Sequence, residues 1–172
     1  MTKIVLIGYM GSGKTTIAKL LSDKLGIPPL DLDQIIEEKV QLPVVAIFEQ
    51  KGEVYFRKQE HMLLKELLSE PGDLILSLGG GTPCYANNHE LLAMEGVVSV
   101  YLKASIDTLY GILTEAKSKR PLIATLEGDQ LKEFIAVHLF ERSFYYNHAM
   151  HKVVIDNKSP EATAEEIMAL LA

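Results

Sequence analysis

The fold of this chain follows from one stretch, Gly8-Tyr9-Met10-Gly11-Ser12-Gly13-Lys14-Thr15, which fits the phosphate-loop pattern G-x-x-x-x-G-K-[ST]. The apolar run Lys3–Ile7 precedes it and is typical of a central parallel strand, apolar on both faces. Over Lys14–Leu25, apolar side chains recur at helical spacing, and Gly26 is placed to end that helix. The motif therefore lies between a strand and a helix, which is where a phosphate loop belongs.

Each part of this motif has a chemical reason. Glycines let backbone N–H groups close around phosphate oxygens, and the helix N-terminus adds the positive end of its dipole. Lys14 is expected to reach the β- and γ-phosphates, and the hydroxyl of Thr15 to bind Mg²⁺. The loop alone predicts a site for a nucleoside triphosphate, which GTPases, motor ATPases and small-molecule kinases share.

Strand-like and helix-like segments alternate on both sides of the motif. Five strands are predicted at 3–7, 28–32, 74–78, 96–102 and 152–155. Helical patterns cover 14–25, pieces of 33–70 broken at Pro43, then 87–94, 105–116, 131–146 and 160–171, with a polar loop at 117–129. This order predicts an α/β fold of three layers, in which helices cover both faces of a five-stranded parallel sheet.

Length and composition narrow the class of protein. The chain has 172 residues, the size of one domain, and 17 basic residues against 23 acidic ones give a net charge of -6. We therefore expect neither nucleic acid nor a membrane surface as a partner. Apolar runs of about five residues are too short to cross a bilayer. With no secretory signal pattern and a single cysteine, Cys84, we expect a cytoplasmic protein, and we expect a monomer.

Two carboxylates are candidates for the metal and the acceptor. The third strand ends Leu76-Ser77-Leu78-Gly79, without the aspartate that a typical ATPase places there. The second strand ends in Asp31-Leu32-Asp33, and alternate residues of a strand share a face, so both carboxylates should emerge together at the carboxyl end of the sheet. The alternative is that the pair caps the N-terminus of the next helix.

The chain has three arginines, Arg57, Arg120 and Arg142, among its 17 basic residues. Arginine is the better side chain for a two-point grip on carboxylate or phosphate, so these positions are informative. Arg57 and Glu60 lie on one predicted helix face, either in a site or as a surface ion pair. Residues 79–81 are all glycine and follow a strand directly, where either a ligand approaches the backbone or a plain loop runs.

In this combination the motifs resemble the shikimate kinase family, and the resemblance runs through nearly the whole chain. The matching residues are GYMGSGKTT at 8–16, Asp31-Leu32-Asp33, Ile47-Phe48, Gly52-Glu53, Phe56-Arg57, Glu60, 78–81, Arg120-Pro121-Leu122-Ile123, Arg142, Tyr145 and Ala149. The phosphate loop is shared with many families, whereas the ordered set is specific.

The resemblance implies an ATP-dependent kinase that phosphorylates the 3-hydroxyl of shikimate in aromatic amino acid biosynthesis, with Mg²⁺ as cofactor. It implies an ATP site of Gly11, Ser12, Gly13, Lys14, Thr15, Thr16 and Arg120, and a metal site of Thr15 and Asp31. Shikimate would be bound by Asp33, Arg57, Gly79, Gly80, Gly81 and Arg142. Lys14, Asp33 and Arg120 would be catalytic, with Asp33 as the candidate base. A single kinase domain would span 1–172, with a substrate-binding segment at 34–60 and a lid at 117–128.

The chain departs from the family pattern beside the adenine ring. Shikimate kinases commonly carry a further arginine about two helical turns before the lid motif, and Leu113 is expected at that position. Leucine cannot make a cation–π contact, so either Lys117 or Lys119 replaces the arginine or apolar packing holds the ring. The adenine loop is expected at 157–160.

Two other functions remain open at this point. One is another small-molecule kinase of the same architecture, such as a gluconate or nucleoside-monophosphate kinase, against which the two acceptor arginines and the three glycines argue. The other is a nucleotide-binding module without catalysis. The complete set Lys14, Thr15, Asp31, Asp33 and Arg120 argues against that second possibility.

Overall fold

A five-stranded parallel sheet forms the centre of the computed structural model, which describes residues 1–116 and 120–172. The strands are β1 (Lys3–Ile7), β2 (Pro29–Asp31), β3 (Leu74–Ser77), β4 (Val97–Lys103) and β5 (His151–Val154). They lie in the order β2-β3-β1-β4-β5, and every neighbouring pair is parallel. The predicted α/β fold is confirmed.

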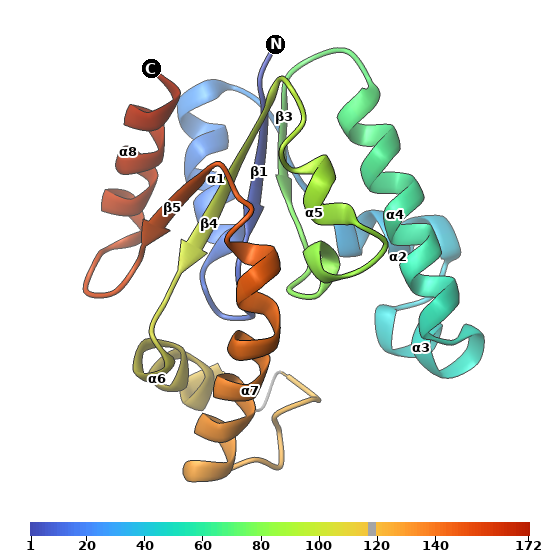
Figure 1. The fold of residues 1–172 in the computed structure, drawn as a ribbon, viewed down its shortest axis with the longest axis vertical. Helices are drawn as coiled ribbons and strands as arrows, with labels where there is room; N and C mark the ends of the chain where they lie inside the picture. The colour runs from blue at the N-terminus through green and yellow to red at the C-terminus, as the bar shows by residue number, and fades with distance from the viewer. Residues whose placement is uncertain (117–119) are drawn as a thin grey trace.

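Helices cover both faces of the sheet (Figure 1). They are α1 (Lys14–Leu25), α2 (Leu32–Val40), α3 (Val44–Lys51), α4 (Glu53–Ser69), α5 (Asn88–Leu91), α6 (Ile106–Ala116), α7 (Asp129–Tyr146) and α8 (Pro160–Leu171). A 3₁₀ turn, η1 (Thr82–Cys84), lies between β3 and α5. The break at Pro43 and the polar loop before α7 agree with the prediction.

The alternation of side chains along β1 builds two separate cores. Ile4 and Leu6 are buried with residues of α1 and α8 on one face of the sheet. Val5 and Ile7 are buried on the other face, with residues of α2, α3 and α4. Because β1 is apolar on both faces, it can lie at the middle of the sheet and fix the loop that follows it.

One predicted helix is much shorter than expected. The pattern at 87–94 predicts a helix, but only α5 forms there, and it is a single turn. Ala86 and Asn87 precede it with φ of 50° and 54°, in the left-handed region that interrupts a regular helix. The chain therefore turns sharply between η1 and α5 and keeps η1 close to α4 and α7.

The carboxyl ends of the strands all point to one edge of the sheet, where the loop after β1, the glycines after β3, α6 and α7 lie (Figure 1). Residues 120–128 form turns there, and Ile123 is fully buried in a third core with Leu131. The start of the predicted lid, 117–119, lies outside the described residues. Within the described ranges, no helix is long and apolar enough to span a membrane.

Candidate active site

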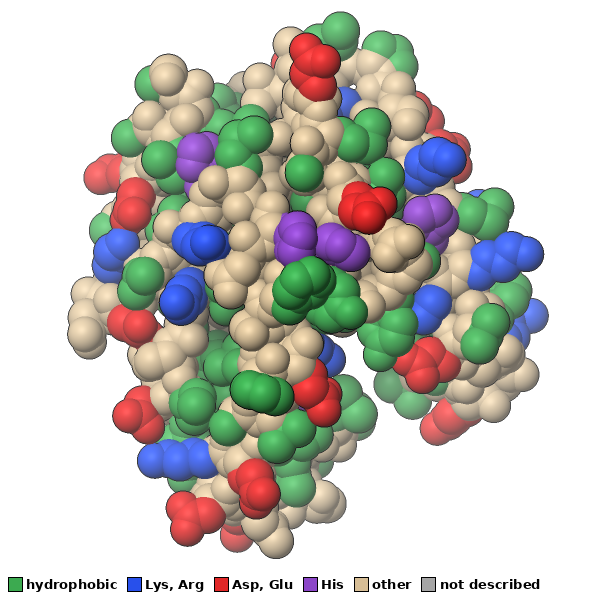
Figure 2. All heavy atoms as spheres, viewed as in Figure 1, with side chains coloured by type: hydrophobic (Ala, Val, Ile, Leu, Met, Phe, Trp, Pro, Cys, Tyr) green, Lys and Arg blue, Asp and Glu red, His purple; other side chains and the backbone are tan. Residues whose placement is uncertain are grey.

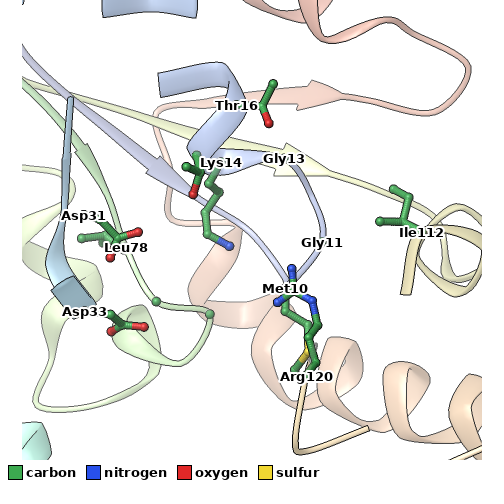
Figure 3. A pocket seen from close by; sticks show the side chains of 13 residues that line it. Met10, Gly11, Gly13, Lys14, Thr16, Asp31, Asp33, Leu78, Ile112 and Arg120 are labelled. Carbon is green, nitrogen blue, oxygen red and sulfur yellow. The ribbon is translucent and has the colours of Figure 1, made fainter. Parts of the chain in front are cut away.

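The loop after β1 folds back over the start of α1. Gly11 and Gly13 have φ of 81° and 91°, a left-handed conformation that glycine adopts without strain. The Nζ atom of Lys14 donates to the carbonyl oxygens of Gly8 (2.6 Å) and Tyr9 (3.1 Å). The side chain of Lys14 is thereby held over the loop, inside the cavity at the edge of the sheet (Figure 3).

This phosphate cavity has a volume of about 470 Å³. Its lining includes most of the residues expected to bind nucleotide and metal, namely Gly11, Gly13, Lys14, Thr15, Thr16, Asp31 and Arg120, together with Asp33, the candidate base. Figure 3 shows the side chain of Lys14 between the two aspartates on one side and Arg120 on the other. The structure thus brings together residues that lie more than a hundred positions apart in the chain.

The two aspartates do not share a strand face, so that interpretation of the sequence is wrong. β2 ends at Asp31 and α2 begins at Leu32, which places Asp33 in the first turn of a helix. Asp31 caps that helix, because its Oδ1 atom accepts a hydrogen bond from the backbone N–H of Gln34 (3.1 Å). Both carboxylates still line the phosphate cavity, since the chain passes from strand to helix at its edge.

The surroundings of Asp33 and Lys14 shift both groups toward their neutral forms. Burial, reinforced by the charges of Asp31 and Glu60, raises the pKa of Asp33 to about 6. Burial lowers the pKa of Lys14 to about 8, although the charge of Asp33 partly opposes this shift. At pH 7, Asp33 is then mostly ionised but far more basic than an ordinary carboxylate, which suits a group that accepts a proton.

The three glycines after β3 form a wall against which the charged groups of the site lie. We call residues 79–81 the glycine wall. A Cβ atom would lie 2.9 Å from Asp33 Oδ1 at Gly79, 2.9 Å from Arg142 Nη1 at Gly80 and 2.9 Å from Arg57 Nη2 at Gly81. A side chain at any of these positions would displace one of these charged groups, so the three glycines allow Asp33, Arg142 and Arg57 to pack closely against the backbone.

Arg57 is held on several sides. Its Nη1 atom donates to Oε1 of Glu60 (2.9 Å), and Glu60 is only 1% exposed. The other oxygen of Glu60 accepts a hydrogen bond from Thr82 (2.7 Å), and the ring of Tyr85 lies 3.9 Å from the guanidinium carbon of Arg57. The pair of Arg57 and Glu60 is therefore part of the site and not a surface ion pair.

A second cavity, of about 510 Å³, holds these groups. It is lined by Met10, Asp33, Val45, Arg57, Glu60, Gly79, Gly80, Gly81, Arg120, Pro121, Leu122 and Arg142. Met10, Asp33, Gly79, Gly80 and Arg120 also line the phosphate cavity, so the two spaces adjoin. Figure 2 shows a notch between the part of the molecule that holds α7 and the part that holds α3 and α4. We call this second space the acceptor cavity, since the guanidinium groups of Arg57, Arg120 and Arg142 suit a small anion placed beside the phosphate loop.

A third cavity, of about 300 Å³, lies beside the phosphate loop and includes residues of the expected adenine loop. Ser12, Ile112, Asn157, Lys158 and Pro160 are among its lining residues. Leu113 is not: it is fully buried in the core with Tyr9 and Ile123, and Ile112 faces the cavity instead. Apolar packing by Ile112 is the alternative that fits, while Lys117 and Lys119 lie outside the described residues.

A phosphate loop beside a cavity lined by three guanidinium groups is typical of a small-molecule kinase of the phosphate-loop class. The shikimate kinase family model matches residues 10–172, and the chain belongs to that family. It is therefore an ATP-dependent kinase. Curated shikimate kinases from Flavobacterium johnsoniae and Flavobacterium psychrophilum are 59% and 53% identical to it, over 100% and 99% of both chains.

Solved structures agree with this assignment. A shikimate kinase from Bacteroides thetaiotaomicron matches with a TM-score of 0.89 at 34% identity, over 99% of this chain and 98% of that one. One from Acinetobacter baumannii, in complex with shikimate, matches with a TM-score of 0.85 at 32% identity, over 99% and 93%. A deoxyadenosine kinase from M. mycoides, 18% identical with a TM-score of 0.60, shares the fold.

The position of Ile112 generates a prediction about the nucleotide base. Replacing Ile112 with arginine should lower the KM for ATP about two- to fivefold, because a guanidinium over an aromatic ring adds ~0.5–1 kcal/mol. Steady-state kinetics at saturating acceptor measures this. The matched control is Ile112→Gln, which is polar but carries no charge and should not lower the KM. An arginine variant with an unchanged KM would show that Ile112 does not face the base.

Proposed function

We propose that this chain transfers the γ-phosphoryl group of ATP to the 3-hydroxyl of shikimate and releases shikimate 3-phosphate and ADP. The observation that carries the proposal is the pair Arg57 and Arg142, whose guanidinium groups lie against one glycine wall in the acceptor cavity. Two guanidinium groups at one wall suit a small carboxylate. Membership of the family, and the relative from Acinetobacter baumannii in complex with shikimate, support the choice of substrate.

On the acceptor side, Arg57, Arg142 and the backbone of the glycine wall would bind the carboxylate and ring of shikimate. Asp33 would accept a hydrogen bond from the 3-hydroxyl and orient it. When the hydroxyl oxygen forms its bond to the γ-phosphorus, the bond from that phosphorus to the β,γ-bridging oxygen breaks and ADP leaves. The hydroxyl proton passes to Asp33, whose raised pKa of about 6 favours that transfer.

On the donor side, Gly11, Ser12, Gly13 and Thr16 would bind the phosphates of ATP together with Lys14 and Arg120. Lys14 and Arg120 both line the phosphate cavity, from α1 and from the segment before α7. Two cations on the transferring group stabilise the charge that its oxygens carry during transfer. Such a reaction depends on position and charge rather than on a covalent enzyme intermediate.

We also propose that Thr15 and Asp31 hold Mg²⁺. Both line the phosphate cavity and offer the oxygen ligands that Mg²⁺ prefers. One oxygen of Asp31 already caps α2, which suits contact with the ion through water. No cluster of three or more His, Cys, Asp or Glu side chains suited to a metal occurs in 1–116 and 120–172, so phosphates and water would complete the coordination. The ion neutralises phosphate charge when bound.

Two segments would close over the substrates, the acceptor-binding segment 34–60 and the lid 117–128, both within one kinase domain. Val45 of α3 and Leu122 of the described part of the lid both line the acceptor cavity, and Leu122 is 71% exposed. Closure would bury such apolar groups and exclude water that competes with the acceptor. We also propose that the protein acts as a monomer in the cytoplasm.

An assay of ADP release tests the function directly. Purified protein with Mg²⁺ and ATP is expected to release ADP with shikimate, and not with gluconate or nucleoside monophosphates. Mass spectrometry of the product should show one added phosphoryl group. ADP release with gluconate or a nucleoside monophosphate in place of shikimate would identify another kinase, and ATP binding without any acceptor-dependent release would identify a silent binding module.

Arg57→Ala should raise the KM for shikimate about 10- to 100-fold, because hydrogen bonds to charged groups contribute ~1.5–3 kcal/mol. The KM for ATP should stay unchanged, since Arg57 lines the acceptor cavity and not the phosphate cavity. Steady-state kinetics with each substrate varied in turn measures both values. A normal KM for shikimate would remove Arg57 from the acceptor site.

Variants of Tyr85 control for the placement of Arg57. Tyr85→Leu removes the stacked ring and leaves the charge, so the KM for shikimate should rise less, about two- to tenfold. Tyr85→Phe keeps the ring, so its KM for shikimate should equal that of the unchanged protein.

Asp33→Asn should lower kcat roughly 10²- to 10⁴-fold, the usual contribution of a proton acceptor. Asparagine has the same shape and can still contact the hydroxyl, so the KM for shikimate should change much less than kcat. Single-turnover measurements of shikimate 3-phosphate separate the chemical step from product release. A kcat near that of the unchanged protein would exclude Asp33 as the base.

A further inference from the structure

One face of α7 carries three functional contacts at intervals of four residues. His138, Arg142 and Tyr146 share this face, because residues four apart in a helix lie one above the other. Arg142 lies between the other two and lines the acceptor cavity. On one side of it, the hydroxyl of Tyr146 donates to the carbonyl oxygen of Gly80 (2.6 Å). This contact ties α7 to the glycine wall.

On the other side of Arg142, α7 is tied to the phosphate loop. Nδ1 of His138 lies 2.7 Å from the hydroxyl of Tyr9, the residue that follows the first glycine of the loop. The ring of Phe134 packs against His138 with its edge, at 4.3 Å between centroids. His138 is therefore held between a residue of its own helix and a residue of the loop. Figure 1 shows α7 below the carboxyl edge of the sheet, next to that loop.

Tyr9 contacts both Lys14 of the phosphate loop and Arg142 of the acceptor cavity. Its carbonyl oxygen accepts a hydrogen bond from Lys14 (3.1 Å), and its ring centroid lies 5.6 Å from the guanidinium carbon of Arg142. The side chain of Tyr9 is only 1% exposed, so it cannot move without opening the core. A shift of Tyr9 would therefore change the position of Lys14 relative to Arg142.

The chemistry of the hydrogen bond is defined by its surroundings. Burial raises the pKa of Tyr9 to about 12, and burial together with the charge of Arg142 holds the pKa of His138 below its ordinary value. Both groups are therefore neutral near pH 7. The hydroxyl of Tyr9 donates, and Nδ1 of a neutral imidazole accepts, with the ring proton on Nε2.

We propose that Tyr9 and His138 are positioning residues that set the distance between Arg142 and the phosphate loop, and so align the bound acceptor with the γ-phosphoryl group. This inference rests on the proposed role of Arg142 in binding the acceptor carboxylate. Without the hydrogen bond, the contact of Tyr146 with Gly80 still holds Arg142 at the glycine wall. The acceptor would then bind normally but lie out of line with the phosphoryl group.

The expected signature is a loss of kcat without a loss of acceptor binding. Tyr9→Phe and His138→Leu should each lower kcat on the order of tenfold, because small errors in alignment slow a transfer step. The KM for shikimate should change by less than about twofold. The double variant should be no slower than either single one, since both substitutions remove the same hydrogen bond.

His138→Asn is the conservative variant. Its side-chain oxygen can take the place of Nδ1 as acceptor, so it should retain most of kcat, whereas His138→Leu should not. Thermal unfolding and ADP binding by calorimetry, measured on all variants, report whether the fold and the nucleotide site are intact. Tyr9→Phe keeps the buried ring and serves if His138→Leu is unstable.

Several results would overturn the inference. One is a raised KM for shikimate with unchanged kcat in the Tyr9→Phe or His138→Leu variant. Another is a double variant in which the two decreases in kcat multiply. A third is equal kcat for His138→Asn and His138→Leu when their unfolding midpoints match. If Arg142→Ala raises the KM for shikimate and the Tyr9 and His138 variants behave normally, only this inference fails. If the unchanged protein shows no shikimate-dependent ADP release, the proposed function fails instead.

Discussion

The active site is organised by a lack of space at the glycine wall. Asp33, Arg142 and Arg57 come from α2, α7 and α4, and each has a side-chain atom 2.9 Å from the place where a Cβ atom of Gly79, Gly80 or Gly81 would be. Real Cβ atoms do not approach other atoms so closely, so the three functional groups depend on three successive glycines. The position of β3 beside β1 in turn places this wall next to the phosphate loop.

The same close packing accounts for the electrostatics. The protein carries a net charge of -6, yet Lys14, Arg57, Arg120 and Arg142 line two adjoining cavities. Asp33 and Glu60 lie among them, and burial moves the pKa of Lys14 down and that of Asp33 up. Bound anions would replace the water around these cations, so little reorganisation is needed when a phosphoryl group is transferred. A local positive site can therefore exist in an acidic protein.

Local sequence rules predicted the parts of the molecule that depend on neighbours in the chain. The phosphate loop needs only a strand, glycines and a helix in succession, and the structure has all three as expected. The same rules failed where a chain segment ends. Asp33 was expected on a strand face, but the helix begins one residue after Asp31, because Asp31 itself caps it. Helical phase likewise decides that Ile112, and not the buried Leu113 next to it, lines the third cavity.

Contacts between distant segments could not be predicted in this way. Tyr9 and His138 are separated by 129 positions, and no spacing rule links a loop tyrosine to a histidine on a later helix. Tyr85 likewise contacts Arg57, and Thr82 donates to Glu60, through the folding of the segment that follows β3. A sequence motif can thus identify the groups that touch substrates, whereas the groups that hold them in place become visible only in three dimensions.

The third cavity and the acceptor cavity therefore differ in how readily their lining residues can be substituted. In the third cavity, Ile112 is 38% exposed and lines the space from one side, so a side chain of another size or polarity can be accommodated there. At the acceptor cavity, two of the arginines are packed against backbone and against a second side chain: Arg57 between Gly81 and Tyr85, Arg142 between Gly80 and Tyr9. A substitution at either position would disturb at least two neighbours at once. The packing of Arg57 and Arg142 therefore leaves less freedom for substitution than the partly exposed position of Ile112.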